Sequence, residues 1–326
     1  MQNLFDKASL VMVPSGYDNG KLYNIKPEDK GSAFEFERSS MGTRVNSDGL
    51  IEFVGVGEEL ATATNWSNGP TYDTNTGTLT AINLTSNTSI DVNIENNETY
   101  LITYTIVSIA SAGAGARTLL GGSGGSQQPY RNQPGTYREV VTYPSGASID
   151  KLYFSVNGTT SFEITDISLK QISNDTPRID YSSGEGALLL EPARTNLLDN
   201  SEYDGGSGWT KSSTTTIIKD NQIKDPFGGY NSYRLTTQNL YDNIIKQVVR
   251  TVTGNHTATI FIKGVDGVAS SGSFVMSRGV GFDIDSSGVI TTKNPTGYSA
   301  ATSYHLEYIS NGWYKIGLSN KFCILK

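Results

Sequence analysis

The sequence predicts an all-β protein, with two jelly-roll-like antiparallel β-sandwiches preceded by an extended N-terminal arm. Its 326 residues include 35 Gly and 18 Tyr but only 11 Phe, and Ser, Thr and Asn are abundant. This composition is typical of strands joined by turns. Short runs that alternate apolar and polar residues recur along the chain, and this pattern favours strands with one buried and one solvent-exposed face.

The first 56 residues hold little apolar material. Two short apolar patches, Leu10–Val13 and Leu50–Val54, are separated by turn-rich sequence such as residues 15–20. These patches are too small for an independent core, so we expect residues 1–56 to form an extended arm on a partner or on the next domain. The alternative is a strand pair that completes the first sandwich.

Residues 57–174 are predicted to form the first sandwich. Apolar residues at every second position put one face of each strand inward, and turn clusters separate the strands at jelly-roll intervals. The alternating runs are residues 79–84, 90–94, 100–106, 152–156 and 162–164.

Residues 175–198 are predicted to form an extended connector. Pro177 and Pro192 lack amide donors, so this segment joins a sheet only at an edge or a bulge. Leu188–Leu190 and Leu197–Leu198 are its apolar anchors, which we expect to be buried against a neighbouring domain or subunit.

Residues 199–326 are predicted to form the second sandwich. Its landmarks are Trp209, a Gly-rich turn at residues 228–230, a hairpin after Phe282 and a turn at Trp313. The sequence ends at Lys326, soon after the Trp313 strand. If a further strand closes this sheet, we expect the arm or another subunit to supply it; otherwise the sheet has an exposed edge, which proteins usually avoid.

Two stretches of the chain are variations on one pattern. Residues 36–52 read FERSSMGTRVNSDGLIE, and residues 177–198 read PRIDYSSGEGALLLEPARTNLL. With the ordered landmarks of residues 199–326, this pair resembles bacteriophage virion proteins of the fibre and appendage kind, of tail-fibre or head-fibre type. In that family the first stretch closes an N-terminal segment, and a β-sandwich similar to carbohydrate-binding modules follows the second.

The resemblance implies a virion protein that docks to other virion proteins through residues 1–56. It also implies a homo-oligomer, with a trimer favoured by analogy with phage fibres. The N-terminus lacks a signal peptide and no stretch approaches the roughly 18 apolar residues of a membrane span, so we expect synthesis in the host cytoplasm and no membrane insertion.

The charge pattern argues against nucleic-acid binding. The net charge is −7 and only 17% of residues are charged. Residues 1–56 carry 6 basic and 8 acidic side chains, residues 57–174 carry 5 and 10, and residues 175–326 carry 14 of each. No segment offers the basic surface that a phosphate backbone requires.

The sequence assigns no catalytic residue. Gly121–Gly125 has the letters of a nucleophile elbow around Ser123, but the residues that follow are poor helix formers, which favours a loop tip. His256 and His305 are the only imidazoles, and Cys323 is the only thiol. The chain therefore has no internal disulfide or cysteine-based metal site.

Asp283 and Asp285 are the weak metal candidate. Acidic residues at alternate positions before Gly288 resemble the first half of a calcium loop, but position 294 is Asn instead of the bidentate Glu. A hairpin turn in which Asp285 bonds the backbone explains the same letters and is favoured. We expect no cofactor, with calcium as the alternative.

Aromatic residues in polar surroundings are the candidate platforms for a sugar ring, since sugars stack on exposed Trp and Tyr faces. Each could equally be a core or turn residue. The candidates are Trp66, Tyr72, Tyr130, Tyr137, Trp209, Tyr230 and Tyr233.

Three functions remain open from the sequence. The leading hypothesis is a non-enzymatic fibre or fibre-adaptor subunit that contributes to attachment to host-surface glycans. The second is a capsid or tail decoration protein without a ligand of its own. The third is a polysaccharide-binding or polysaccharide-degrading module.

Overall fold

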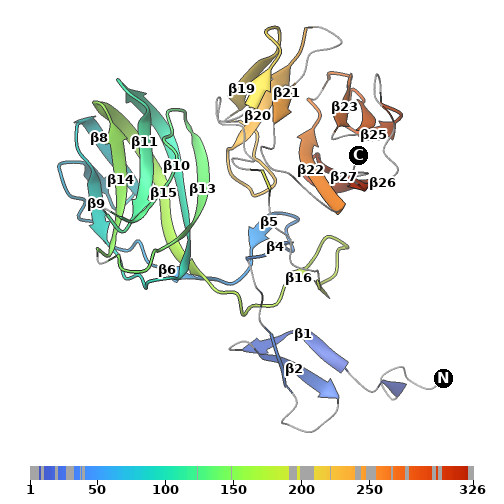
Figure 1. Cartoon of the computed structure of the whole chain (residues 1–326), viewed down its shortest axis with the longest axis horizontal. Coiled ribbons are helices and arrows are strands. Elements are labelled where there is room, and N and C mark those ends of the chain that lie inside the picture. Colours follow the sequence, from blue (N-terminus) through green and yellow to red (C-terminus); the bar gives the residue numbers. More distant parts are fainter. Residues whose placement is uncertain are drawn as a thin grey trace, which may run out of the picture.

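The computed structural model confirms the all-β prediction, because every regular element among the described residues is a strand. The strands form a sandwich, an N-terminal sheet and a group of small C-terminal sheets around a central pair of hairpins (Figure 1). The described residues are 7–8, 11–18, 21–26, 33–36, 38, 41–122, 124–147, 149–190, 197–198, 209–220, 222–238, 244–246, 255–265, 267–275, 279–295, 299 and 303–321.

The first sandwich consists of a larger and a smaller antiparallel sheet. In the larger sheet the order is β13-β10-β15-β8-β7, and β6 also pairs with β15. Its strands are β6 (Val56–Glu59), β7 (Thr71–Asp73), β8 (Thr78–Leu84), β10 (Thr99–Ser111), β13 (Gly135–Thr142) and β15 (Thr160–Ile172). The smaller sheet runs β12-β11-β14-β9, with β9 (Thr88–Asp91), β11 (Gly115–Leu120), β12 (Ser126–Gln127) and β14 (Lys151–Asn157).

The alternation in the sequence produces the core between these two sheets. On β10, Tyr100, Ile102, Tyr104 and Ile106 are at most 1% exposed, whereas the residues between them are half-buried. Burial of this many apolar side chains is the main stabilising term of the domain. The buried cluster also includes Leu79, Ala81, Ile90, Leu120, Leu152, Phe154, Phe162, Ile164 and Leu169.

The N-terminal segment does not form one continuous arm. The strands β1 (Val11–Asp18), β2 (Lys21–Lys26) and β3 (Ala33–Glu35) form a separate antiparallel sheet that stands apart from the sandwich (Figure 1). The next strands, β4 (Thr43–Val45) and β5 (Ile51–Phe53), make a hairpin, and only β6 joins the first sandwich. Residues 1–55 therefore do not complete that sandwich within the described part of the chain.

The connector and the C-terminal region hold the remaining strands. The connector contains a short hairpin of β16 (Ile179–Asp180) and β17 (Ala187–Leu188). Two further strand pairs follow, β18 with β21 and β19 with β20, from β18 (Trp209–Lys211), β19 (Thr216–Asp220), β20 (Ser232–Thr236) and β21 (Ile244–Lys246).

The last strands form two small sheets that share one core. One sheet has the order β22-β27-β26 and the other β23-β24-β25. Val280 packs with Ile316 and Leu318, all at most 1% exposed, so these sheets form a compact sandwich. The strands are β22 (Asn255–Lys263), β23 (Ser270–Val275), β24 (Gly279–Ile284), β25 (Ile290–Lys293), β26 (Ser303–Ser310) and β27 (Trp313–Lys321).

A substitution in the core of the first sandwich tests this architecture. Ile102 is 0% exposed, whereas Ile82 on β8 of the same sheet is 79% exposed. We expect Ile102→Ala to lower the free energy of unfolding of this domain by about 2–5 kcal/mol, because it leaves a cavity. Ile82→Ala should change it by less than about 0.5 kcal/mol. Urea unfolding of both variants measures the difference, and equal losses would contradict the assignment of the core.

Candidate functional site

The two related stretches of sequence meet in the middle of the molecule. Residues 38–55 and 173–190 contact each other there, and a loop of residues 224–230 from the C-terminal region contacts both the first of these segments and the first sandwich. We call these three segments the junction. It lies between the N-terminal sheet, the first sandwich and the C-terminal sheets (Figure 1).

The first hairpin of the junction is held by its own turn. The Asn46 side-chain Oδ1 accepts hydrogen bonds from the backbone N–H groups of Asp48 at 3.0 Å and Leu50 at 2.9 Å. Gly49 follows with φ 76°, the left-handed conformation that glycine adopts without strain. Arg44 and Glu52, which are paired across the strands, form an ion pair at 2.7 Å.

The second hairpin repeats this construction. Asp180 occupies the place of Asn46, and its Oδ1 accepts a hydrogen bond from the Ser182 N–H at 3.0 Å. Burial raises the pKa of Asp180, but hydrogen bonds from Ser182 and from the Val45 N–H outweigh it, so the pKa lies below its ordinary value. The common pattern of the two stretches is thus a strand followed by an Asn or Asp that caps a turn.

The two hairpins bond directly to each other. The Val45 N–H donates to the Asp180 Oδ2 at 2.9 Å, and the Tyr181 N–H donates back to the Val45 carbonyl at 2.9 Å. The Arg178 Nε donates to the Thr43 carbonyl at 2.8 Å. One hairpin therefore satisfies backbone groups of the other, although about 135 residues separate them along the chain.

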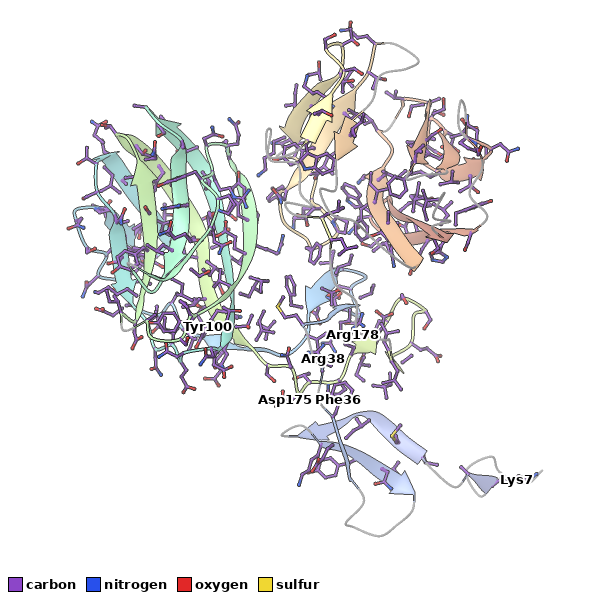
Figure 2. All side chains as sticks on the ribbon, in the orientation of Figure 1. Lys7, Phe36, Arg38, Tyr100, Asp175 and Arg178 are labelled. Carbon is purple, nitrogen blue, oxygen red and sulfur yellow. The ribbon has the colours of Figure 1, made fainter. Side chains whose placement is uncertain are left out.

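Arg38 ties the start of the first stretch to the end of the first sandwich. Its N–H donates to the Asn174 carbonyl at 2.9 Å, and its Nη2 donates to the Ser173 carbonyl at 3.2 Å. Figure 2 shows Arg38 near Arg178, and a Cβ on Gly42 would meet both of these side chains. Burial, and then the positive charge of Arg178, lower the pKa of Arg38.

Gly55 is the closest contact between the first hairpin and the end of the first sandwich. Its φ is 80°, and a Cβ there would lie 2.2 Å from the Ser173 carbonyl oxygen. The Ser173 N–H in turn donates to the Gly55 carbonyl at 2.8 Å. Only glycine combines this backbone conformation with so close an approach.

The loop of residues 224–230 links the first hairpin of the junction to the C-terminal sheets. The Asp225 carboxylate is buried and accepts hydrogen bonds from the N–H groups of Phe227 at 2.8 Å and Gly229 at 3.0 Å. The Ile51 N–H donates to the Pro226 carbonyl at 2.9 Å. From β27, the Trp313 Nε1 donates to the Lys224 carbonyl at 2.8 Å.

The same loop contacts the edge of the first sandwich. On β13, the Arg138 Nη1 lies 3.4 Å from the Asp225 Oδ2, and its Nη2 donates to the Phe227 carbonyl at 3.0 Å. The Lys219 Nζ lies 3.9 Å from the centre of the Tyr137 ring. Hydrogen bonds and an ion pair between segments from different domains thus hold the junction together.

Two of the predicted sugar platforms pack against aromatic residues of the first core. Tyr137 is 4% exposed, lies 5.4 Å from the Tyr104 ring and bonds the Gln133 carbonyl, so it belongs to the packing and the prediction of an open platform is wrong for it. Trp66 packs 5.6 Å from Phe154 and is half-buried. Tyr137 does lie near two other candidates. The Lys219 Nζ is 3.9 Å from the ring centre of Tyr137 and 5.8 Å from that of Tyr233, and the Thr136 N–H donates to the Tyr230 carbonyl at 3.2 Å.

The other five aromatic candidates are half-buried. Tyr130 lies under the Arg117 guanidinium, 4.4 Å from its ring centre, and Tyr230 lies 5.9 Å from the Lys224 Nζ. Tyr233 and Trp209 are on β20 and β18. Tyr72 packs on the edge of the first core. Sugar binding by these residues stays a prediction.

Asp283 and Asp285 are engaged in the β24–β25 hairpin. The Asp285 Oδ1 accepts hydrogen bonds from the N–H groups of Ser287 at 2.8 Å and Val289 at 3.0 Å, which with the Ser287 hydroxyl lower the pKa of Asp285. Asp283 pairs with Lys293. This geometry matches the favoured turn, and calcium binding stays an untested alternative.

Other features add no site. Within the described residues no group of His, Cys, Asp and Glu could hold a metal ion, and no helix is long and apolar enough to cross a membrane. Ser123 and Cys323 lie outside the described residues. His305 is exposed and lies 3.3 Å from the Glu307 carboxylate.

The sequence reasoning missed a buried carboxylate, Glu139. It is 4% exposed inside the first sandwich, where the Thr118 and Tyr104 hydroxyls donate to it and Arg131 lies 3.5 Å away. Burial raises the pKa of Glu139, and these partners offset the shift only partly. The sequence could have indicated that Glu139 is buried, because in an alternating strand it lies on the same face as Tyr137 and Val141.

Comparison with known proteins adds little. No family model matches the chain, and no curated protein matches it. One similar solved structure is described as the N-terminal CBM22-1-CBM22-2 tandem domain of Xyn10C from Paenibacillus barcinonensis. The identity is 12%, and the match covers 83% of this chain and 91% of that chain. Its TM-score of 0.24 is too low to carry an argument about ligand or activity.

Substitution of Gly55 tests the joint. We expect Gly55→Ala to destabilise the protein by about 1–3 kcal/mol or more, because it combines strain at positive φ with a clash against Ser173. Gly77→Ala is the matched control, since Gly77 has φ 66° but the nearest atom to its Cβ is 3.9 Å away. Thermal unfolding compares the two variants. Equal shifts of Tm would mean that the contact with Ser173 is unimportant.

Glu139 gives a pH-dependent prediction. Its folded-state pKa is raised above the ordinary 4.5, so the folded state holds the proton more tightly than the unfolded state. The stability that this group contributes is full below that value and is lost as pH rises through the folded pKa. Wild type should therefore lose stability relative to Glu139→Gln as the pH rises above the ordinary 4.5 and through the raised folded-state pKa, measured by urea unfolding at a series of pH values. A constant difference between the two proteins would contradict this.

Proposed function

We propose that this chain is a non-catalytic structural subunit of a bacteriophage particle, of the fibre or fibre-adaptor type. It docks through its N-terminal sheet and presents its β-domains for attachment to the host surface. The resemblance of residues 36–52 and 177–198 to phage appendage proteins supports this proposal, and these are the residues that build the junction.

The observation that carries the proposal is the isolation of the N-terminal sheet. Strands β1 to β3 pair only with one another and stand apart from the sandwich (Figure 1). On β2, Leu22 is 3% exposed, but Tyr23 and Ile25 are 47% and 46% exposed on the other face. A small sheet with large apolar side chains on its open face suits a protein–protein interface.

The junction supports a load-transmitting role. The first hairpin bonds to the connector and to the 224–230 loop, and that loop also bonds to Arg138 of the first sandwich. These contacts hold the domains together. A fibre subunit requires such fixed domain orientation. The exposed Tyr304 and Tyr308 on β26, at 51% and 58%, offer a surface for the homo-oligomer that we also propose.

A cryo-EM map of the particle that carries this chain tests the proposal. We expect residues 11–35 to be buried against other virion proteins, with the first sandwich projecting away and several copies around one axis. A variant with Tyr23→Ser and Ile25→Ser should be absent from purified particles, while Ile218→Ser, at a 62% exposed site on β19, should assemble normally. Both β-domains lying flat on the shell would instead favour a decoration protein.

A further inference from the structure

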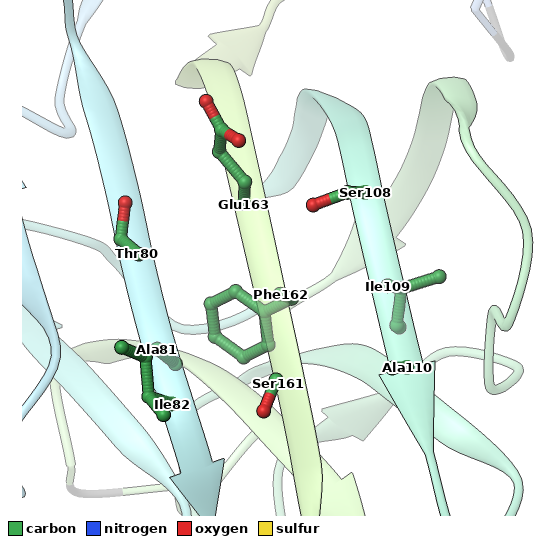
Figure 3. Close-up of a pocket in the computed structure, with 9 residues that line it drawn as sticks. All are labelled: Thr80, Ala81, Ile82, Ser108, Ile109, Ala110, Ser161, Phe162 and Glu163. Atoms are coloured by element: carbon green, nitrogen blue, oxygen red, sulfur yellow. The ribbon is translucent and has the colours of Figure 1, made fainter.

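A shallow groove of about 300 Å³ crosses the outer face of the larger sheet of the first sandwich. It runs over β8, β15 and β10, and its floor consists of two rows of side chains that point away from the core (Figure 3). This volume lies at the lower end of the range of ligand-binding pockets.

The first row is polar. Glu163 on β15 pairs with Thr80 on β8 and with Ser108 on β10, so the three side chains stand side by side, as Figure 3 shows. None of the three forms a side-chain hydrogen bond or ion pair with the described residues. Elsewhere on this sheet neighbouring hydroxyls do bond each other, as Thr105 and Thr136 do at 3.0 Å.

The second row is apolar or small. Ile82, Ser161 and Ala110 form it, and Ile82 is 79% exposed, the most exposed large apolar side chain of the described residues. The Ser161 hydroxyl oxygen already accepts one hydrogen bond, from the Asn83 N–H at 2.9 Å. Along a strand the two rows lie about 7 Å apart, so one small ligand reaches both.

We infer that this groove binds a neutral saccharide. A carboxylate and two free hydroxyls suit the several O–H groups of a sugar, and the Ile82 side chain suits its C–H face. No Lys or Arg lines the groove, so an anionic sugar would meet the uncompensated charge of Glu163. This inference deepens the proposed function and rests on its attachment role.

The position of the groove fits that role. Glu163 lies about 30 Å along β15 from Ser173, where the junction begins. The groove is thus far along β15 from the connector and the first hairpin, whereas its β10 side lies nearer the 224–230 loop, because Thr105 pairs with Thr136, whose N–H donates to the Tyr230 carbonyl. A ligand there would not interfere with docking.

Isothermal titration calorimetry on the full chain tests the inference. The probes are neutral hexasaccharides (cello-, xylo-, malto- and mannohexaose), with hexagalacturonate and hexalysine as charged comparisons. We expect at least one neutral probe to bind and hexagalacturonate not to bind. Glu163→Gln should weaken binding about tenfold or more, because it removes a charged hydrogen-bond acceptor. Ile82→Ala should weaken it less.

Asp166→Asn is the matched control. It makes the same change of charge on the same strand, at an exposed residue outside the groove whose φ of 52° Asn tolerates. It should bind like wild type. Absence of binding by every neutral probe, stronger binding of hexalysine, or equal losses in Glu163→Gln and Asp166→Asn would overturn the inference. The groove can fail in this way while residues 11–35 still dock to the particle, so the two proposals are separable.

Discussion

The exchange of hydrogen bonds between Val45 and the Asp180–Tyr181 segment is the constraint on which the arrangement of domains depends. Neither hairpin of the junction has a core of its own, and an isolated two-stranded hairpin is marginal in water. Each becomes ordered because the other satisfies its backbone groups. The chain must therefore return to its starting point after the first sandwich, which makes that sandwich an insert between the two halves of the junction.

This constraint explains why glycine and arginine recur around the joint. Gly42 and Gly55 are needed because a Cβ at either position would lie within 3.0 Å of an atom of residues 173–190. Arg38, Arg138 and Arg178 reach carbonyl groups that no strand partner satisfies. A guanidinium group donates in several directions at once, which suits the irregular backbone between domains better than a lysine would.

Many of the strands were predictable because the alternation of apolar and polar residues along a strand can be seen within a few neighbouring positions of the sequence. The alternation that predicted strands in residues 79–84, 100–106 and 162–164 is the burial pattern observed on β8, β10 and β15. The pairing of two hairpins 135 residues apart was not predictable, because a similarity of sequence does not say that two segments touch. The groove was missed for a related reason. Its residues are unremarkable one by one, and only the register places Thr80, Glu163 and Ser108 in one row.

Strand β15 connects these separate features. One end pairs with β6 and leads into the junction through Ser173, while the other end pairs with β8 and forms the floor of the groove. A bulged, 13-residue strand in the middle of a sheet is stiff, because its neighbours fix it on both sides along most of its length. The distance between the junction and the groove is therefore set by covalent geometry and sheet pairing, and a force applied at the groove reaches the junction without passing through a flexible linker.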